Sequence, residues 1–126
     1  MRVKAQTKWV RNGARKLSRV AQLLRGMPAV DALNMLEMMP NKSAEIFAKL
    51  VKAAIANAKH NFKLSADSLI VDEAFSNKGV ILKRWRARAR GRVGSIHKPT
   101  SHATVWLKSV EKVTKPALPA GREAKA

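Results

Sequence analysis

Cysteine is absent from this chain of 126 residues, which excludes disulfides and zinc–thiolate sites. No run of about 18 apolar residues occurs, so the sequence predicts no membrane-spanning helix. The first residues, Met1 to Lys4, lack the apolar region of a signal peptide. Together these absences favour a cytosolic protein.

Acidic residues are scarce. The chain has 8 Asp and Glu against 26 Lys and Arg, which gives a net charge of +18 and a pI of about 11.5. A hydrophobic content of 46% still suffices for the core of a single domain. A folded chain this basic is typical of proteins that bind nucleic acid.

The side chains that catalysis needs are also few. His97 and His102 are five residues apart, so on one strand they would face opposite ways and could not share a metal ion. The Ser101–His102 pair has no nearby carboxylate in the sequence, because no acidic residue lies between positions 74 and 110. No Gly-rich loop leads into a helix to hold a phosphate. The sequence therefore predicts no catalytic residue, no metal site and no cofactor.

The positive charge is concentrated in two segments. Residues 1–26 contain eight Lys and Arg and no acid, and residues 83–98 contain seven and no acid. Residues 27–82 contain six bases and six acids. We therefore expect the neutral middle to build the core and the two basic segments to face the ligand.

Hydrophobic periodicity predicts a chain of mixed helices and strands. Alternation from Val3 to Arg11 predicts a half-buried strand, and Asn12 is expected to cap the helix that follows. The third predicted helix has an apolar face wide enough to pack on both a sheet and a neighbouring helix. The predicted helices span about residues 14–25, 29–38 and 42–61. Further strands are predicted at residues 69–75 and 80–82, with a bulge or offset at 76–79, and at 97–113.

The segment from Lys83 to Lys98 is basic and lies between two strand-like runs. This pattern predicts a long hairpin arm that spans about residues 76–100. Charges at this density cannot enter a core unpaired, so the arm should project by roughly 25 Å and meet an anionic partner. A polyphosphate backbone is the first candidate, and the arginines and Trp85 could also stack on bases. Residues 1–113 are expected to form one domain that includes this arm, and residues 114–126 a flexible basic tail.

The arm and its flanks resemble a known family. The resemblance is carried by Ala87-Arg88-Ala89-Arg90-Gly91-Arg92, followed by Ile96, Lys98 and Thr100-Ser101-His102. Further matches are Arg25-Gly26 after the first helix, and Ala54-Ile55-Ala56-Asn57-Ala58 with His60-Asn61 in the third. Over about residues 3–110 the chain resembles the universal large-subunit ribosomal protein family L-twenty-two, of bacterial type.

The resemblance implies an α+β fold, in which three helices pack on a small antiparallel sheet and a long basic β-hairpin extends from it. It implies a structural constituent of the large ribosomal subunit in the cytoplasm, monomeric within the ribosome, which aids assembly. The implied partners are several domains of the large-subunit ribosomal RNA, neighbouring ribosomal proteins and the nascent polypeptide. The hairpin tip of the family lines the polypeptide exit tunnel, which assigns that role to Arg86, Ala87, Arg88, Ala89, Arg90, Gly91 and Arg92.

Charge and resemblance together select the candidate RNA-binding residues. These are Lys4, Lys8, Arg11, Arg15, Lys16, Arg19, Arg25, Lys83, Arg84, Trp85, Arg86, Arg88, Arg90, Arg92, His97, Lys98, Thr100, Ser101 and His102. At the tip, strand alternation would place the arginines on one face and the small residues Ala87, Ala89 and Gly91 on the other. The alternative is an architectural DNA-binding protein, for which Trp85 is the one candidate wedge residue in the arm.

Overall fold

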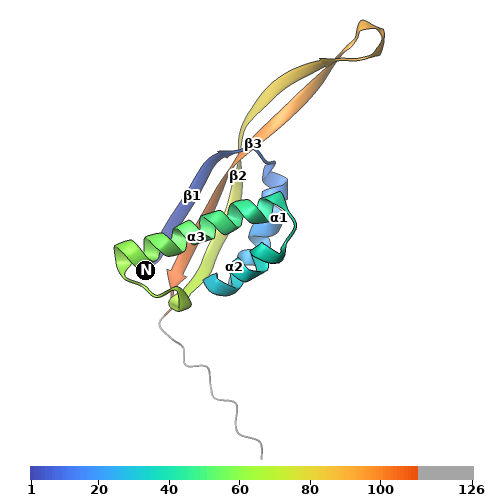
Figure 1. Ribbon diagram of the computed structural model, residues 1–126. Coiled ribbons are helices and arrows are strands. Elements are labelled where there is room, and N and C mark those ends of the chain that lie inside the picture. Colours follow the sequence, from blue (N-terminus) through green and yellow to red (C-terminus); the bar gives the residue numbers. More distant parts are fainter. Residues whose placement is uncertain (111–126) are drawn as a thin grey trace, which may run out of the picture.

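Three helices pack on a three-stranded antiparallel sheet, which confirms the predicted α+β fold (Figure 1). The computed structural model describes residues 1–110, so the predicted tail at 114–126 lies outside the described residues. Strand order in the sheet is β1-β3-β2, with β3 in the centre. The elements are β1 (Arg2–Val10), α1 (Ala14–Leu24), α2 (Ala29–Met38), α3 (Lys42–Phe62), β2 (Leu69–Ala87) and β3 (Val93–Ser109).

The sheet has one covered face and one open face. Alternate residues of the strands point to the helices and are buried, for example Val3 in β1, Val71 in β2 and Leu107 in β3. Their neighbours along each strand point to the face that the helices leave open (Figure 1). The core therefore lies between the sheet and the helix layer.

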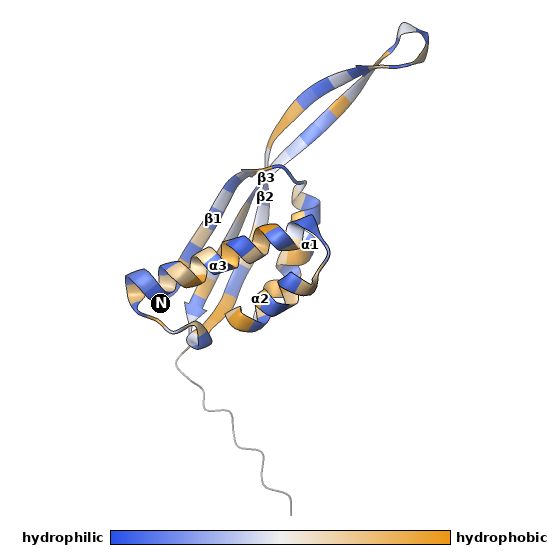
Figure 2. Ribbon diagram, in the orientation of Figure 1, coloured by the Kyte–Doolittle hydropathy of each residue, from blue (hydrophilic) through white to orange (hydrophobic). Residues whose placement is uncertain are grey.

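The longest helix, α3, holds the helix layer together. It packs against β1 and β3 of the sheet and against α1 and α2, as the wide apolar face predicts. Phe47 and Val51 on this face are fully buried, and Figure 2 shows hydrophobic and hydrophilic residues alternating around the helix. The helix ends at Phe62, and the capping residue Lys63 adopts a left-handed conformation with φ of 56°.

Asn12 does not cap α1, which corrects the prediction. The N-cap is Gly13, and no side chain caps the helix. The Asn12 side chain instead accepts a hydrogen bond from the Gly13 N–H, and its amide Nδ2 donates to Ser43 Oγ at 2.8 Å. Asn12 therefore ties the start of α1 to the start of α3.

Strands β2 and β3 continue beyond the end of β1 as a two-stranded extension, residues 79–100 (Figure 1). β1 pairs with β3 only as far as Ser101, whereas the β2–β3 pairing runs to Ala87 and Val93. The eight residue-to-residue steps from Ser101 to Val93 span roughly 26 Å at the rise of a strand. This segment lies within residues 76–100, for which the sequence predicts the arm, while residues 76–78 pair beside the three-stranded part of the sheet.

The base of the extension carries a bulge rather than an interruption. β2 is continuous through residues 76–79, and its register on β3 shifts between Lys78 and Ile81. Gly79 lies against the backbone of Thr100, where an added Cβ would come within 3.1 Å of the Thr100 carbonyl oxygen. Glycine is therefore required here because the two strands approach too closely for a side chain.

Candidate nucleic-acid interface

The predicted contact cations all lie on the surface. In the part of the chain that the structure describes, every Lys and Arg of the candidate set is exposed, from Lys4 in β1 to Lys98 in β3. Trp85, in the extension, exposes 72% of its surface. Arg11 and Lys16 of the first basic segment and Lys98 of the second lie together at the base of the extension.

This meeting point contains two adjoining hollows. One, of about 460 Å³, is lined by Lys16, Arg19 and Lys42, which are the only charged residues around it within residues 1–110. The other, of about 510 Å³, is lined by Arg11, Lys16, Lys42, His97 and Lys98, again without an acidic residue. We call the five cations that line them the basic junction: Arg11, Lys16, Arg19, Lys42 and Lys98.

Hydrogen bonds from buried polar groups fix the geometry of the basic junction. Ser101 of β3 donates its hydroxyl to the carbonyl oxygen of Asn12, and Asn12 donates to Ser43 of α3. Three elements that are distant in the sequence, namely the start of α1, the start of α3 and the base of the extension, are thereby joined. The cations that these elements carry are held close together around one concave surface.

Helix polarity strengthens the positive potential of the basic junction. The first turn of α1 contains no acidic residue, and Lys42 is the first residue of α3. The N-terminal end of a helix carries a partial positive charge from its free N–H groups, so a cation there is unfavourable in isolation. Both helix starts would be stabilised by an anion placed beside them.

The basic face of α1 is set by its buried face. Leu17, Val20 and Leu24 are buried against the core, which turns Arg15 and Arg19 to solvent. Arg25 follows the helix, and its Nε donates to the carbonyl oxygen of Ala74 at 3.0 Å. Arg25 is exposed, and its guanidinium has further N–H donors that can bind another partner.

The tip of the extension is a turn, which corrects the predicted alternation. β2 ends at Ala87, and the Arg88 N–H donates to the Arg92 carbonyl oxygen at 2.7 Å to close a five-residue loop. Arg90 and Gly91 inside this loop both have positive φ, of 58° and 65°. Because these residues are not extended, the arginines and the small residues of the tip do not sort onto two opposite faces.

Two of the candidate contact residues are buried. Thr100 is 6% exposed and donates its hydroxyl to the Val80 carbonyl oxygen. Ser101 is fully buried, and its hydroxyl donates a hydrogen bond to the Asn12 carbonyl oxygen. Both side chains therefore hold the base of the extension in place, and neither presents its hydroxyl on a surface. His102, next along β3, is half-buried on the open face of the sheet.

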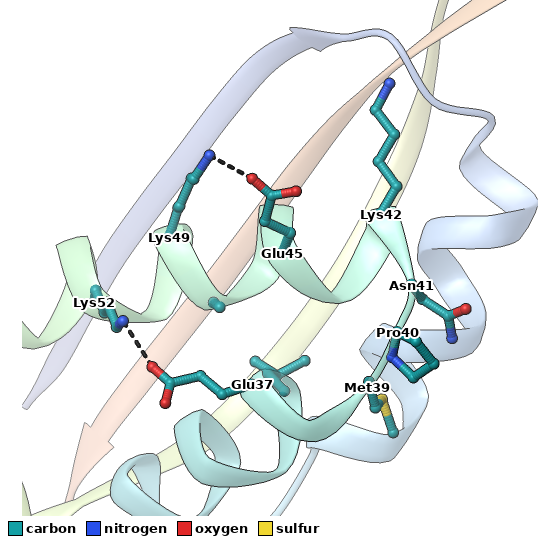
Figure 3. A pocket seen from close by; sticks show the side chains of 10 residues that line it. Glu37, Met39, Pro40, Asn41, Lys42, Glu45, Lys49 and Lys52 are labelled. Atoms are coloured by element: carbon teal, nitrogen blue, oxygen red, sulfur yellow. Dashed lines mark hydrogen bonds and ion pairs between the residues drawn. The ribbon is translucent and has the colours of Figure 1, made fainter.

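A third hollow, lined by residues of α2 and α3, differs from the basic junction. It has a volume of about 580 Å³, lies between α2 and α3, and contains charges of both signs (Figure 3). Lys49 pairs with Glu45 and Lys52 with Glu37, each at 2.7 Å. The hydrogen bond from Lys49 lowers the pKa of the Glu45 carboxyl. Within residues 1–110, Lys42, which also lines the basic junction, is the only lysine of this hollow without an acidic partner, so the hollow attracts a polyanion less than the basic junction does.

Sequence reasoning missed Lys42. It lies in the segment with equal numbers of acids and bases, so the charge distribution gave no reason to select it. The available signal was its position after Asn41 at a predicted helix start, where a lysine is electrostatically unfavourable. Within residues 1–110 no group of His, Asp and Glu could hold a metal ion, and no helix is long and apolar enough to cross a membrane.

Comparison with known proteins gives consistent matches. The family model of ribosomal protein L22p/L17e matches residues 5–108 of this chain. The large ribosomal subunit protein uL22 of Oceanobacillus iheyensis is 45% identical over 105 residues, which cover 83% of this chain and 93% of the relative. The protein of that name from Rhodospirillum rubrum is 47% identical, with 83% of each chain covered. That from Fusobacterium nucleatum is 46% identical, with 83% of this chain and 95% of the relative covered.

Proposed function

The chain belongs to the L22p/L17e family of ribosomal proteins, and from this we propose that it binds large-subunit ribosomal RNA through the basic junction and the extension. As a member of this family it is a structural protein of the large ribosomal subunit in the cytoplasm, and not an enzyme. The expectations of family, non-enzymatic role and location are thereby confirmed. RNA binding, assembly and the tunnel remain parts of the proposal.

The observation that carries the proposal is the convergence, around one concave surface, of cations that have no acidic partner among residues 1–110. Lys16 and Lys42 line both hollows of the basic junction, and no acidic residue lines either of them. Phosphate groups neutralise such cations and release bound counterions, which makes association favourable. The extension carries a second set of cations away from the body, so one protein can contact RNA segments that are far apart. Contact with several RNA domains is how the protein would aid assembly.

The first test removes charge from the basic junction. We expect the double variant Lys16→Gln/Lys42→Gln to bind large-subunit ribosomal RNA at least about tenfold more weakly, because each lysine loses a charged hydrogen bond to phosphate. The matched control is Lys49→Gln/Lys52→Gln, which removes the same charge from the hollow of paired ions (Figure 3). Filter binding measures both, and cosedimentation with large subunits measures incorporation. Equal losses in the two variants would contradict a specific role of the basic junction.

We further propose that the tip of the extension borders the polypeptide exit tunnel, as the family resemblance implies. Its loop, residues 88–92, is exposed throughout and contains three arginines and two small residues. The arginines are suited to hold RNA, while Ala89 and Gly91 leave room for a passing chain. An apolar wedge, as an architectural DNA-binding protein would need, is absent from this loop. Other parts of the body would contact neighbouring ribosomal proteins.

The second test places a photo-crosslinker at the tip. Position 89 is the better choice, because Gly91 has a positive φ that strains any side chain. In ribosomes stalled during translation, we expect a crosslinker at Ala89 to capture the nascent polypeptide. A crosslinker at Leu23, an exposed residue of α1, serves as the control and should capture none. Capture of RNA alone from position 89 would contradict a tunnel-lining tip.

A further inference from the structure

The end of β1 contains a bulge that holds a tryptophan in an unfavourable conformation. Thr7 pairs with Ala103 and Val10 with Ser101, so Lys8 and Trp9 together stand opposite His102 alone. Trp9 has a φ of 58°, in the left-handed region. This conformation costs energy for a residue with a side chain, and most of all for a bulky one, whereas glycine adopts it freely.

The Trp9 side chain contributes little to the stability of the fold, so packing does not offset this strain. Its side chain is 58% exposed, so most of the ring contributes nothing to the core. By contrast, Trp106 on the same sheet is half-buried, and Lys4 Nζ lies over its ring at 5.6 Å. An exposed aromatic ring at a strained position is typical of a residue retained for an intermolecular contact.

His102 positions this ring. The main-chain N–H of Trp9 donates to His102 Nδ1 at 3.1 Å, and the two rings are nearly perpendicular, with centroids 4.7 Å apart. Ser101 and Ala103 point into the core, so His102 between them lies on the open face of the sheet. On the adjacent strand β2, the residue paired with His102 is the exposed Asn77. Trp9, His102 and Asn77 therefore form one row across the open face, an aromatic surface followed by two hydrogen-bonding groups.

We propose that this row is a stacking site for an unpaired RNA base, with Trp9 as the stacking surface and His102 as the residue that positions it. This inference rests on the proposed RNA binding and adds the kind of RNA that is recognised. Unpaired bases stack on aromatic side chains, and a nearby amide can read their edges. The site has cations around it for the flanking phosphates, since Lys8 and Arg11 are both exposed. A stacked base would use the exposed ring surface that the protein itself leaves free.

The test uses tryptophan fluorescence. In the variant Trp85→Phe/Trp106→Phe, Trp9 is the only tryptophan of the chain. Two probes are compared: an oligoadenosine of about 12 nucleotides, and an abasic ribose-phosphate oligomer of the same length and charge. We expect the oligoadenosine to quench Trp9 fluorescence and to bind about tenfold more tightly than the abasic oligomer. Equal binding of the two probes without quenching would overturn the proposal.

Substitutions at position 9 separate stacking from folding. Trp9→Gly fits the left-handed conformation, so we expect the melting temperature to stay the same or rise, while affinity for oligoadenosine falls about tenfold or more. The salt dependence should not change, since no charge is removed. Trp9→Phe should restore most of the affinity and Trp9→Leu should not. Wild-type affinity for oligoadenosine in Trp9→Gly would overturn the inference.

The same experiments distinguish this inference from the proposed function. If the wild-type protein bound neither probe nor ribosomal RNA, RNA binding itself would be wrong. If it bound both probes equally, and Lys16→Gln/Lys42→Gln weakened both, the electrostatic interface would stand and only the base-stacking site would be refuted.

Discussion

Raising the salt concentration from about 50 to about 200 mM should weaken binding to large-subunit ribosomal RNA by roughly 10³- to 10⁵-fold, if about 6–10 phosphates are contacted. The basic junction and the extension together provide enough exposed cations for that number of contacts. Each phosphate that is neutralised releases counterions, so the logarithm of the affinity falls linearly with the logarithm of the salt concentration. Binding titrations at a series of salt concentrations measure this slope.

The two lysine variants give this measurement its control. Lys16→Gln/Lys42→Gln should lower the slope by about two, roughly one for each lysine that contacts phosphate. Lys49→Gln/Lys52→Gln should leave it nearly unchanged, since these lysines are paired with Glu45 and Glu37. A wild-type slope equivalent to one or two ion pairs would contradict an interface of this size.

The helices were predictable from the sequence because each has a buried face with helical spacing. In α1, for example, Leu17, Val20 and Leu24 repeat at intervals that place them on one side. The helix also ends where Gly26, with a φ of 79°, gives a stop signal that the sequence displays. Local patterns of this kind depend on neighbouring residues alone, and the observed bounds agree with the predicted ones to within a residue.

The basic junction could be predicted only in part. The charge distribution selected Lys16 and Arg11, but their proximity to Lys42 and Lys98 depends on how α1, α3 and β3 pack. The hydrogen bonds of Asn12 with Ser43 and Ser101, which set this packing, join residues that are far apart in the sequence. No local pattern contains that information.

Left-handed residues account for the other differences. The turn at the tip depends on Arg90, and the bulge in β1 on Trp9, both with a φ of 58°. Arginine and tryptophan give no sequence signal for this conformation, unlike the glycine that usually occupies it. The sequence therefore predicts strand alternation through the tip, where the chain in fact turns. The same limitation hid the stacking site, because Trp9 follows the pattern of an ordinary strand residue.

The stability of the protein should depend on the body alone. We expect Leu50→Ala to lower the free energy of unfolding by about 2–5 kcal/mol, because it opens a cavity beneath α3, where Leu50 is 3% exposed. The matched control is Leu23→Ala, the same chemical change at a residue that is 53% exposed, with an expected cost within about 0.5 kcal/mol. Urea denaturation measures both variants.

Removal of the tip of the extension should leave the stability of the protein unchanged. None of residues 75–99 belongs to the hydrophobic core, so replacing residues 84–92 by a short turn removes almost no buried apolar surface. We expect the free energy of unfolding of this variant to stay within about 0.5 kcal/mol of the wild type, while its affinity for ribosomal RNA falls steeply with the loss of five arginines. Unfolding of the tip-deleted protein would mean that the extension stabilises the body. Unchanged stability with lost affinity would show that the extension serves binding, because the folded body does not require it.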